Sequence, residues 1–215
     1  MEYLRFMAMY IGDDATETWR RGSFSQFGFS NESSVWLTGW ALVTLHDAVY
    51  PEWEEKGLYI DPKLRADIVS FFVTNQNMNG SWSEVTTIED RNKFGYRLTN
   101  VSGTMKMLNL SLTAQVLIGL HLNTDVPGIP AKFITGTIQR AKAWLEAHYR
   151  WIEDAFDMAI VTYALHLTNS PEQDNALSRL LTFKRMSTRD LLILVIIEML
   201  MLLLFQMRMG YTIRI

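Results

Sequence analysis

The chain has 215 residues, of which 48% are hydrophobic, and its formal net charge is −3. This length predicts one domain, and the apolar share is enough to fill a sizeable core. No basic block stands out, which argues against the phosphate-binding surface that a nucleic-acid-binding protein needs. The chain has no cysteine, which excludes a disulfide, a thiolate metal site and a cysteine nucleophile.

The N-terminal residues predict a short helix and no export signal. Residues 1–10 fit one to three helical turns, which end before Gly12. No basic segment followed by an apolar run and a cleavage site is recognisable, so no signal peptide is predicted.

One turn motif appears twice before an apolar helix. Gly22-Ser23-Phe24 and Gly80-Ser81-Trp82 lie about 58 residues apart. A recurring unit of a turn and a helix is typical of stacked helical hairpins, which cannot bury their apolar faces alone.

The predicted helices alternate between apolar and amphipathic. An apolar helix over 35–49, capped by Ser33 or Ser34, precedes an amphipathic one that begins at Asp61-Pro62. Further helices are expected, in chain order, over 108–122 (apolar), 131–151 (amphipathic), 155–167 (apolar) and after Pro171 (amphipathic). Inner helices sheathed by outer ones produce this alternation. The sequence therefore predicts an all-α fold: an incomplete α/α toroid of about four to five hairpins, plus a hydrophobic C-terminal helix.

Residues 83–108 are polar and irregular, and they predict a long loop. Such a loop is either functional or an insertion without a role of its own.

Residues from about 17 to 186 resemble the thioester-containing (TED) domain of the α2-macroglobulin and complement superfamily. The resemblance rests on ordered blocks over 22–28, 34–38, 59–61, 76–82, 112–118 and 157–165. Its motif residues are Gly22, Phe24, Phe27, Gly28, Trp36, Gln76, Gly80 and Trp82. The insect thioester and macroglobulin-complement-related type is the most similar. The expected domains are therefore 1–186, a partial TED domain, and 187–215, a divergent hydrophobic tail.

The resemblance implies an extracellular protein that traps proteases or marks targets as an opsonin. The family's chemistry is an internal Cys–Gln thioester in a Gly-Cys-Gly-Glu-Gln motif upstream of the first turn, and the chain begins after that point. Many members also carry a histidine shortly after the second turn, but residues 84–91 contain none. The resemblance thus predicts a non-catalytic chain, without cofactor or metal. Its expected partners are other domains of the parent protein, proteases or microbial surfaces.

The tail departs from the family pattern. Residues 191–205 are apolar except for Glu198, and as a helix they reach roughly 22 Å, short of the ~30 Å hydrocarbon layer. Three interpretations remain open: an extra toroid helix or an aberrant splice or gene-model end, a membrane anchor over 191–207, and an interaction helix. The first is favoured over membrane association.

Other candidate sites are weaker. His46, His121, His148 and His166 have no second ligand at helical spacing, so no metal site is predicted. The acidic clusters are expected to be solvated, and they comprise Asp13, Asp14, Glu52, Glu54 and Glu55. Asn31 and Asn100 are candidate glycosylation sites, whereas the matches at Asn79 and Asn109 are assigned to a turn and to a buried helix start.

An enzyme of the terpene cyclase or prenyltransferase type is the main alternative. Gln76-x-x-x-Gly80-x-Trp82 also fits the repeat signature of these toroid enzymes. These enzymes need an acidic motif or a zinc site, and only Asp13-Asp14 weakly resembles such an acidic motif. Trp36 and Trp40 could line a cavity, although core packing is the commoner use of such rings.

Overall fold

The computed structural model describes residues 10–11, 20–25, 32–49, 54–55, 59–84 and 98–186. Within these ranges the chain forms three pairs of helices. The pairs are α2 (Val35–Asp47) with α4 (Pro62–Thr74), α5 (Leu110–Leu122) with α6 (Ala131–His148), and α7 (Ala155–Leu167) with α8 (Gln173–Met186). A single 3-10 turn, η3 (Tyr149–Trp151), follows α6.

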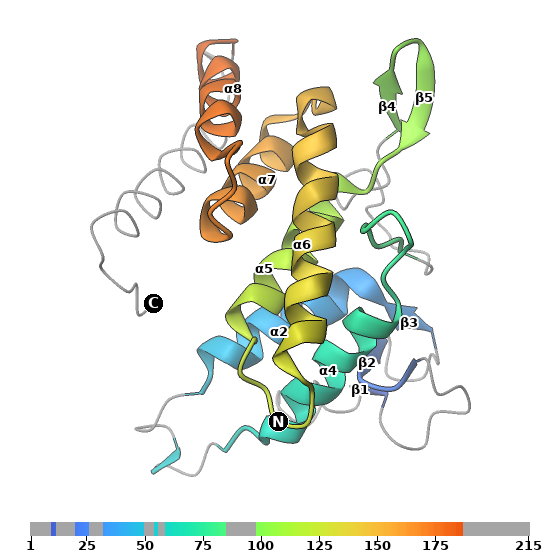
Figure 1. Cartoon of the computed structure of the whole chain (residues 1–215), viewed down its shortest axis with the longest axis vertical. Coiled ribbons are helices and arrows are strands. Elements are labelled where there is room, and N and C mark those ends of the chain that lie inside the picture. Colours follow the sequence, from blue (N-terminus) through green and yellow to red (C-terminus); the bar gives the residue numbers. More distant parts are fainter. Residues whose placement is uncertain are drawn as a thin grey trace.

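The helices form two layers, as the alternation predicts. Helix α5 packs between α2 and α7, and these three form the inner layer, while α4, α6 and α8 each cover one of them (Figure 1). Eleven of the 13 residues of α5 are buried, against five of the 18 in α6, because inner helices have neighbours on several sides. The described part is therefore an arc of a two-layered ring.

Local sequence signals account for where the helices begin. The side chain of Ser34 accepts a hydrogen bond from the backbone N–H of Leu37 (3.2 Å), and Asp61 accepts one from that of Lys63 (2.8 Å). Asp154 caps α7 through the N–H groups of Phe156 and Asp157. These bonds satisfy donors that the first helical turn leaves open.

A small sheet precedes the first helical pair and was not predicted. Strands β1 (Tyr10–Ile11), β2 (Ser23–Ser25) and β3 (Ser33–Ser34) are antiparallel, in the order β1-β2-β3. Tyr10 pairs with Phe24, so the helix predicted for residues 1–10 is wrong at its last residue. Residues 1–9 lie outside the described ranges, as does the tail from 187 on.

The long loop predicted for 83–108 is also corrected. Strands β4 (Leu98–Val101) and β5 (Thr104–Met107) form an antiparallel hairpin that projects from the helices (Figure 1). Its turn residues Ser102 and Gly103 have φ values of 51° and 83°. Two successive left-handed residues are the favoured connection of a two-residue hairpin. Residues 85–97 lie outside the described ranges.

No helix in the described part of the chain has both the length and the apolar character that a membrane span requires.

Candidate functional site

The two glycines of the repeated motif lie against the outer helices. Gly22 has a φ of 86°, and a Cβ atom there would lie 2.1 Å from the carbonyl oxygen of Asp67 in α4. Gly80 has a φ of 93°, and its Cβ would lie 2.4 Å from the carbonyl oxygen of Arg140 in α6. Both positions need glycine for its backbone conformation and for the close approach.

The aromatic residues of the motif are bonded to the inner helices. The backbone N–H of Phe24 donates to Thr38 Oγ1 (2.9 Å), and that of Trp82 donates to Thr113 Oγ1 (3.3 Å). Each threonine is the fourth residue of its helix, α2 or α5. Both aromatic side chains are fully buried. Each turn thus joins an inner helix to the outer helix that follows it.

Gln76, which follows α4, bonds both to the turn at Gly80 and to the outer helix α6. Its Nε2 donates to the carbonyl oxygens of Gly80 (2.9 Å) and Thr137 (3.0 Å), and its Oε1 accepts from Arg140 Nε (2.8 Å). The side chain therefore ties the residues after α4 to α6. Its amide is occupied by structural bonds, which favours a bracing role over a catalytic one.

Glu84 caps the first inner helix from a distance. Its Oε1 accepts from the backbone N–H of Val35 (3.1 Å), and its Oε2 accepts from that of Trp36 (2.8 Å) and from Ser34 Oγ (3.1 Å). The positive end of the helix dipole and the N–H groups both favour a carboxylate at this place. Sequence analysis missed this role, because 48 to 50 residues separate the partners.

The four histidines belong to different helices, and each lies in the last turn of its own helix: α2, α5, α6 or α7. His148 Nδ1 is 2.7 Å from the carbonyl oxygen of Trp144, and His166 Nδ1 is 3.1 Å from that of Thr162. Burial lowers the pKa of His121. Among the residues that the structure describes, no three His, Asp or Glu side chains are grouped to hold a metal ion.

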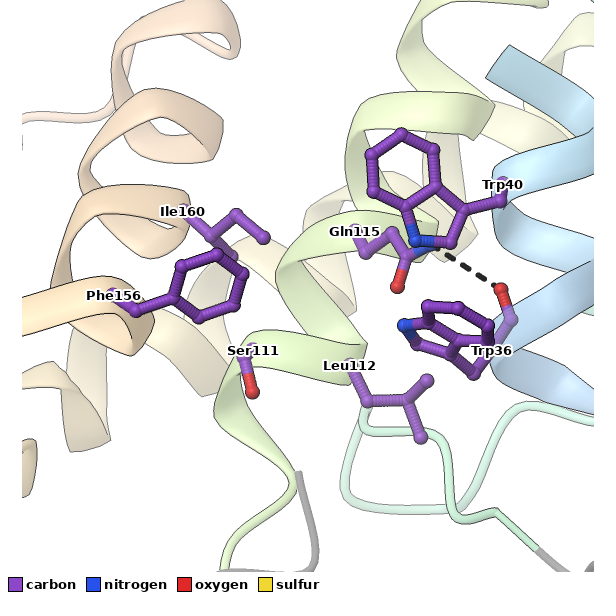
Figure 2. A pocket seen from close by; sticks show the side chains of 7 residues that line it. All are labelled: Trp36, Trp40, Ser111, Leu112, Gln115, Phe156 and Ile160. Atoms are coloured by element: carbon purple, nitrogen blue, oxygen red, sulfur yellow. Dashed lines mark hydrogen bonds between the residues drawn. The ribbon is translucent and has the colours of Figure 1, made fainter. Parts of the chain in front are cut away.

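An apolar depression lies on the inner layer, at the N-terminal ends of its three helices (Figure 2). It is open to solvent and is lined by Trp36, Trp40, Ser111, Leu112, Gln115, Phe156 and Ile160. Gln115 Nε2 donates to the carbonyl oxygen of Trp36 (3.2 Å) and so links α5 to α2. Phe156 and Ile160 lie on one side of α5, and the two tryptophans lie on its other side (Figure 2).

The two tryptophans differ in burial, since Trp36 packs against the core and Trp40 is exposed at the depression. Trp40 is 47% exposed and Phe156 is 40% exposed, while Trp36 is half-buried. The two tryptophan rings meet edge to face, with centroids 6.3 Å apart. The nearly all-apolar sequence predicts that this helix is buried on several sides, and in the described part of the chain α2 leaves one face open.

The lining of the depression offers no acid. Its seven residues include no carboxylate or histidine, so they provide neither a proton donor nor metal ligands for a cyclase reaction. Asp13, Asp14 and Glu52 lie outside the described ranges, and Glu54 and Glu55 are exposed.

The structure describes only some of the remaining residues that the sequence analysis singled out. Asn100 lies in β4 and pairs with Met105. Asn79 Oδ1 accepts from the backbone N–H (3.0 Å) and the Oγ (2.8 Å) of Ser81, which closes the turn. Asn109 is buried and donates to Ser83 Oγ. Asn31, Phe27 and Gly28 lie outside the described residues.

The family model of the A-macroglobulin TED domain matches residues 14–193 of the chain. The chain belongs to this family. Its two-layered arc is part of the α/α toroid of a TED domain, so the predicted family and fold class are confirmed. No curated protein matches the chain. The repeated turns, Gln76 and Glu84 are thus the internal braces of a TED domain.

Proposed function

We propose that this chain is a non-catalytic fragment of a secreted macroglobulin-like or complement-like protein that inhibits endopeptidases or marks microbial surfaces, and that the residues of this chain contribute no covalent chemistry of their own. The observation that carries the proposal is the family match together with the lack of cysteine. A Cys–Gln thioester needs a cysteine sulfur, so no residue of this chain can form one. The domain then meets its targets through its surface and through the other domains of its parent protein.

The use of Glu84 supports this proposal. The segment 84–91 is where the resemblance places an acyl-directing histidine, and it contains none. Its first residue instead gives its carboxylate to the N-terminus of α2. An extracellular location and glycans at Asn31 and Asn100 belong to the same proposal.

The test is to incubate the purified chain with target proteases and with bacterial or yeast cells. We expect retention under native washing and complete release in hot detergent, because only non-covalent contacts form. The variant Gly80→Ala, which disturbs a brace between the layers, controls for binding that depends on the fold. An adduct that survives hot detergent, or no retention on any target, would contradict the proposal.

A further inference from the structure

The turn that follows α4 presents a glycan acceptor pattern to solvent. Asn79-Gly80-Ser81 has an asparagine and, two residues later, a hydroxyl side chain, with a residue other than proline between them. Asn79 is exposed, and the side chain of Met78 before it is fully exposed. The sequence also predicts a turn here, and a turn excludes a glycan only where it needs the amide nitrogen of Asn79.

The turn uses only the carbonyl half of the Asn79 side chain. Its Oδ1 accepts hydrogen bonds from the backbone N–H (3.0 Å) and from the Oγ (2.8 Å) of Ser81. A backbone N–H can only donate, so the amide atom that faces it is the oxygen, and Nδ2 lies on the other side of the amide group. Among the described residues, Nδ2 of Asn79 has no hydrogen-bond partner.

Other groups close the turn without this nitrogen. The N–H of Gly80 donates to the carbonyl oxygen of Asn77 (2.9 Å), and the N–H of Asn77 donates to the carbonyl oxygen of Ser81 (2.9 Å). Gln76 Nε2 donates to the carbonyl oxygen of Gly80 (2.9 Å). A sugar on Nδ2 of Asn79 therefore breaks none of the bonds that hold the turn against α6.

Asn109, which matches the same pattern, has the opposite environment. It is only 9% exposed, and its Nδ2 donates to Ser83 Oγ (3.1 Å). A glycan on this nitrogen would have to lie inside the protein, where a bulky hydrated sugar has no room. The structure thus separates two matches that the sequence pattern alone treats alike.

We propose that Asn79 carries an N-linked glycan on its Nδ2 atom. In the transfer, Nδ2 forms a bond to the anomeric carbon of a lipid-linked oligosaccharide, and the bond from that carbon to the diphosphate oxygen of the lipid breaks. Nδ2 gives up one proton, and the lipid diphosphate leaves with the bonding electron pair. The proposal rests on the function proposed above only in that the chain must reach the secretory lumen, where this transfer takes place.

The glycan marks the outer layer at this turn as a surface that faces solvent in the parent protein. Gly80, the residue after the acceptor, lies against α6, so the sugar is attached where the chain leaves α4 and passes α6. Glycans are bulky and hydrated, and they keep protein surfaces apart. Contacts with other domains or with targets are therefore made away from this turn.

The test directs the full chain into the secretory lumen of a eukaryotic cell with an added signal peptide and a C-terminal tag that holds a known glycan acceptor site. Intact glycopeptides are mapped by mass spectrometry, which separates a sugar from deamidation of Asn79-Gly80. We expect a glycan at residue 79 in the unchanged chain and in the control Asn109→Gln. The variants Asn79→Gln and Ser81→Ala should lose it completely, because one lacks the acceptor and the other the hydroxyl group of the pattern.

Occupancy is read only on chains whose tag is glycosylated, whether they are secreted or retained in the cell, so the result does not depend on folding of a variant. A bare Asn79 on such chains would overturn the proposal. It would leave the function proposed above intact, since that function fails instead on a covalent adduct or on the absence of any target.

A second measurement tests where the glycan lies in the folded protein. Secreted chains are treated with a peptide N-glycosidase, natively and after denaturation. We expect release from residue 79 at a similar rate in both states, because Nδ2 faces solvent. Release only after denaturation would contradict the exposed position of this side chain.

Discussion

Gly22 and Gly80 occupy equivalent places in two successive helical pairs. Both have left-handed backbones, and both lie against a carbonyl oxygen of the next outer helix. Any side chain there meets two separate obstacles: the backbone conformation and the neighbouring helix. Gly103 has a similar φ of 83°, but nothing lies within 4 Å of the position that a Cβ atom would take there. A substitution at Gly103 therefore measures the cost of the backbone conformation alone.

Substitution at Gly80 should therefore cost more stability than substitution at Gly103. For Gly103→Ala we expect a loss of about 1–2 kcal/mol, the cost of a left-handed conformation. Gly80→Ala should lose distinctly more, because α6 must also move away from the turn. Urea unfolding of both variants measures the difference, and equal losses would show that the contact with Arg140 is unimportant.

At the scale of elements, Glu84 ties the second repeated unit to the first. Its carboxylate lies at the N-terminus of α2, next to the capping side chain of Ser34. Only an ionised carboxylate offers acceptors on both oxygens without a competing donor. The two successive helical pairs are thus coupled through one buried side chain.

The variant Glu84→Gln tests this coupling. We expect the free energy of unfolding to fall by about 1–3 kcal/mol, because an NH₂ group would face an N–H donor and the charge would be lost. Glu153→Gln, at an exposed position before α7, is the matched control and should change little. A loss at Glu84 no larger than that at Glu153 would argue against the cap.

Some elements could be predicted from local signals and others could not. The apolar run over 155–167 predicts α7 correctly at both ends, because a capping Asp precedes it and Thr168-Asn169 follows it. The β4–β5 hairpin was missed, since mixed polar and apolar strands give no clear alternation around Ser102-Gly103. The exposed face of α2 was missed for a different reason: an apolar helix does not reveal which side lacks a neighbour.

For the whole molecule, Tyr163 and Asp47 report on the geometry of the arc, because they belong to α7 and α2, on either side of α5. Burial, and to a smaller extent the Asp47 carboxylate, raises the pKa of the Tyr163 phenol. An unfolded tyrosine ionises near pH 10, so above about that pH the unfolded state loses a proton that the folded state keeps. The free energy of unfolding should therefore not depend on this phenol below about pH 10, and it should fall as the pH rises from there through the pKa of folded Tyr163.

We expect Tyr163→Phe to flatten this alkaline loss of stability, and Asp47→Asn to flatten it by a smaller amount. Urea unfolding measured from about pH 8 to 11 follows the effect. If Tyr163→Phe leaves the alkaline slope unchanged, the arc does not bury this phenol as described.

The central claim is that α2, α5 and α7 form an inner layer sheathed by α4, α6 and α8. Amide hydrogen exchange, resolved by helix, tests it most directly, because protection follows burial within the cooperative core. The account predicts the slowest exchange in α5, which has inner neighbours on both sides and α6 over it. Exchange in α6 or α8 as slow as that in α5 would contradict the layered arc.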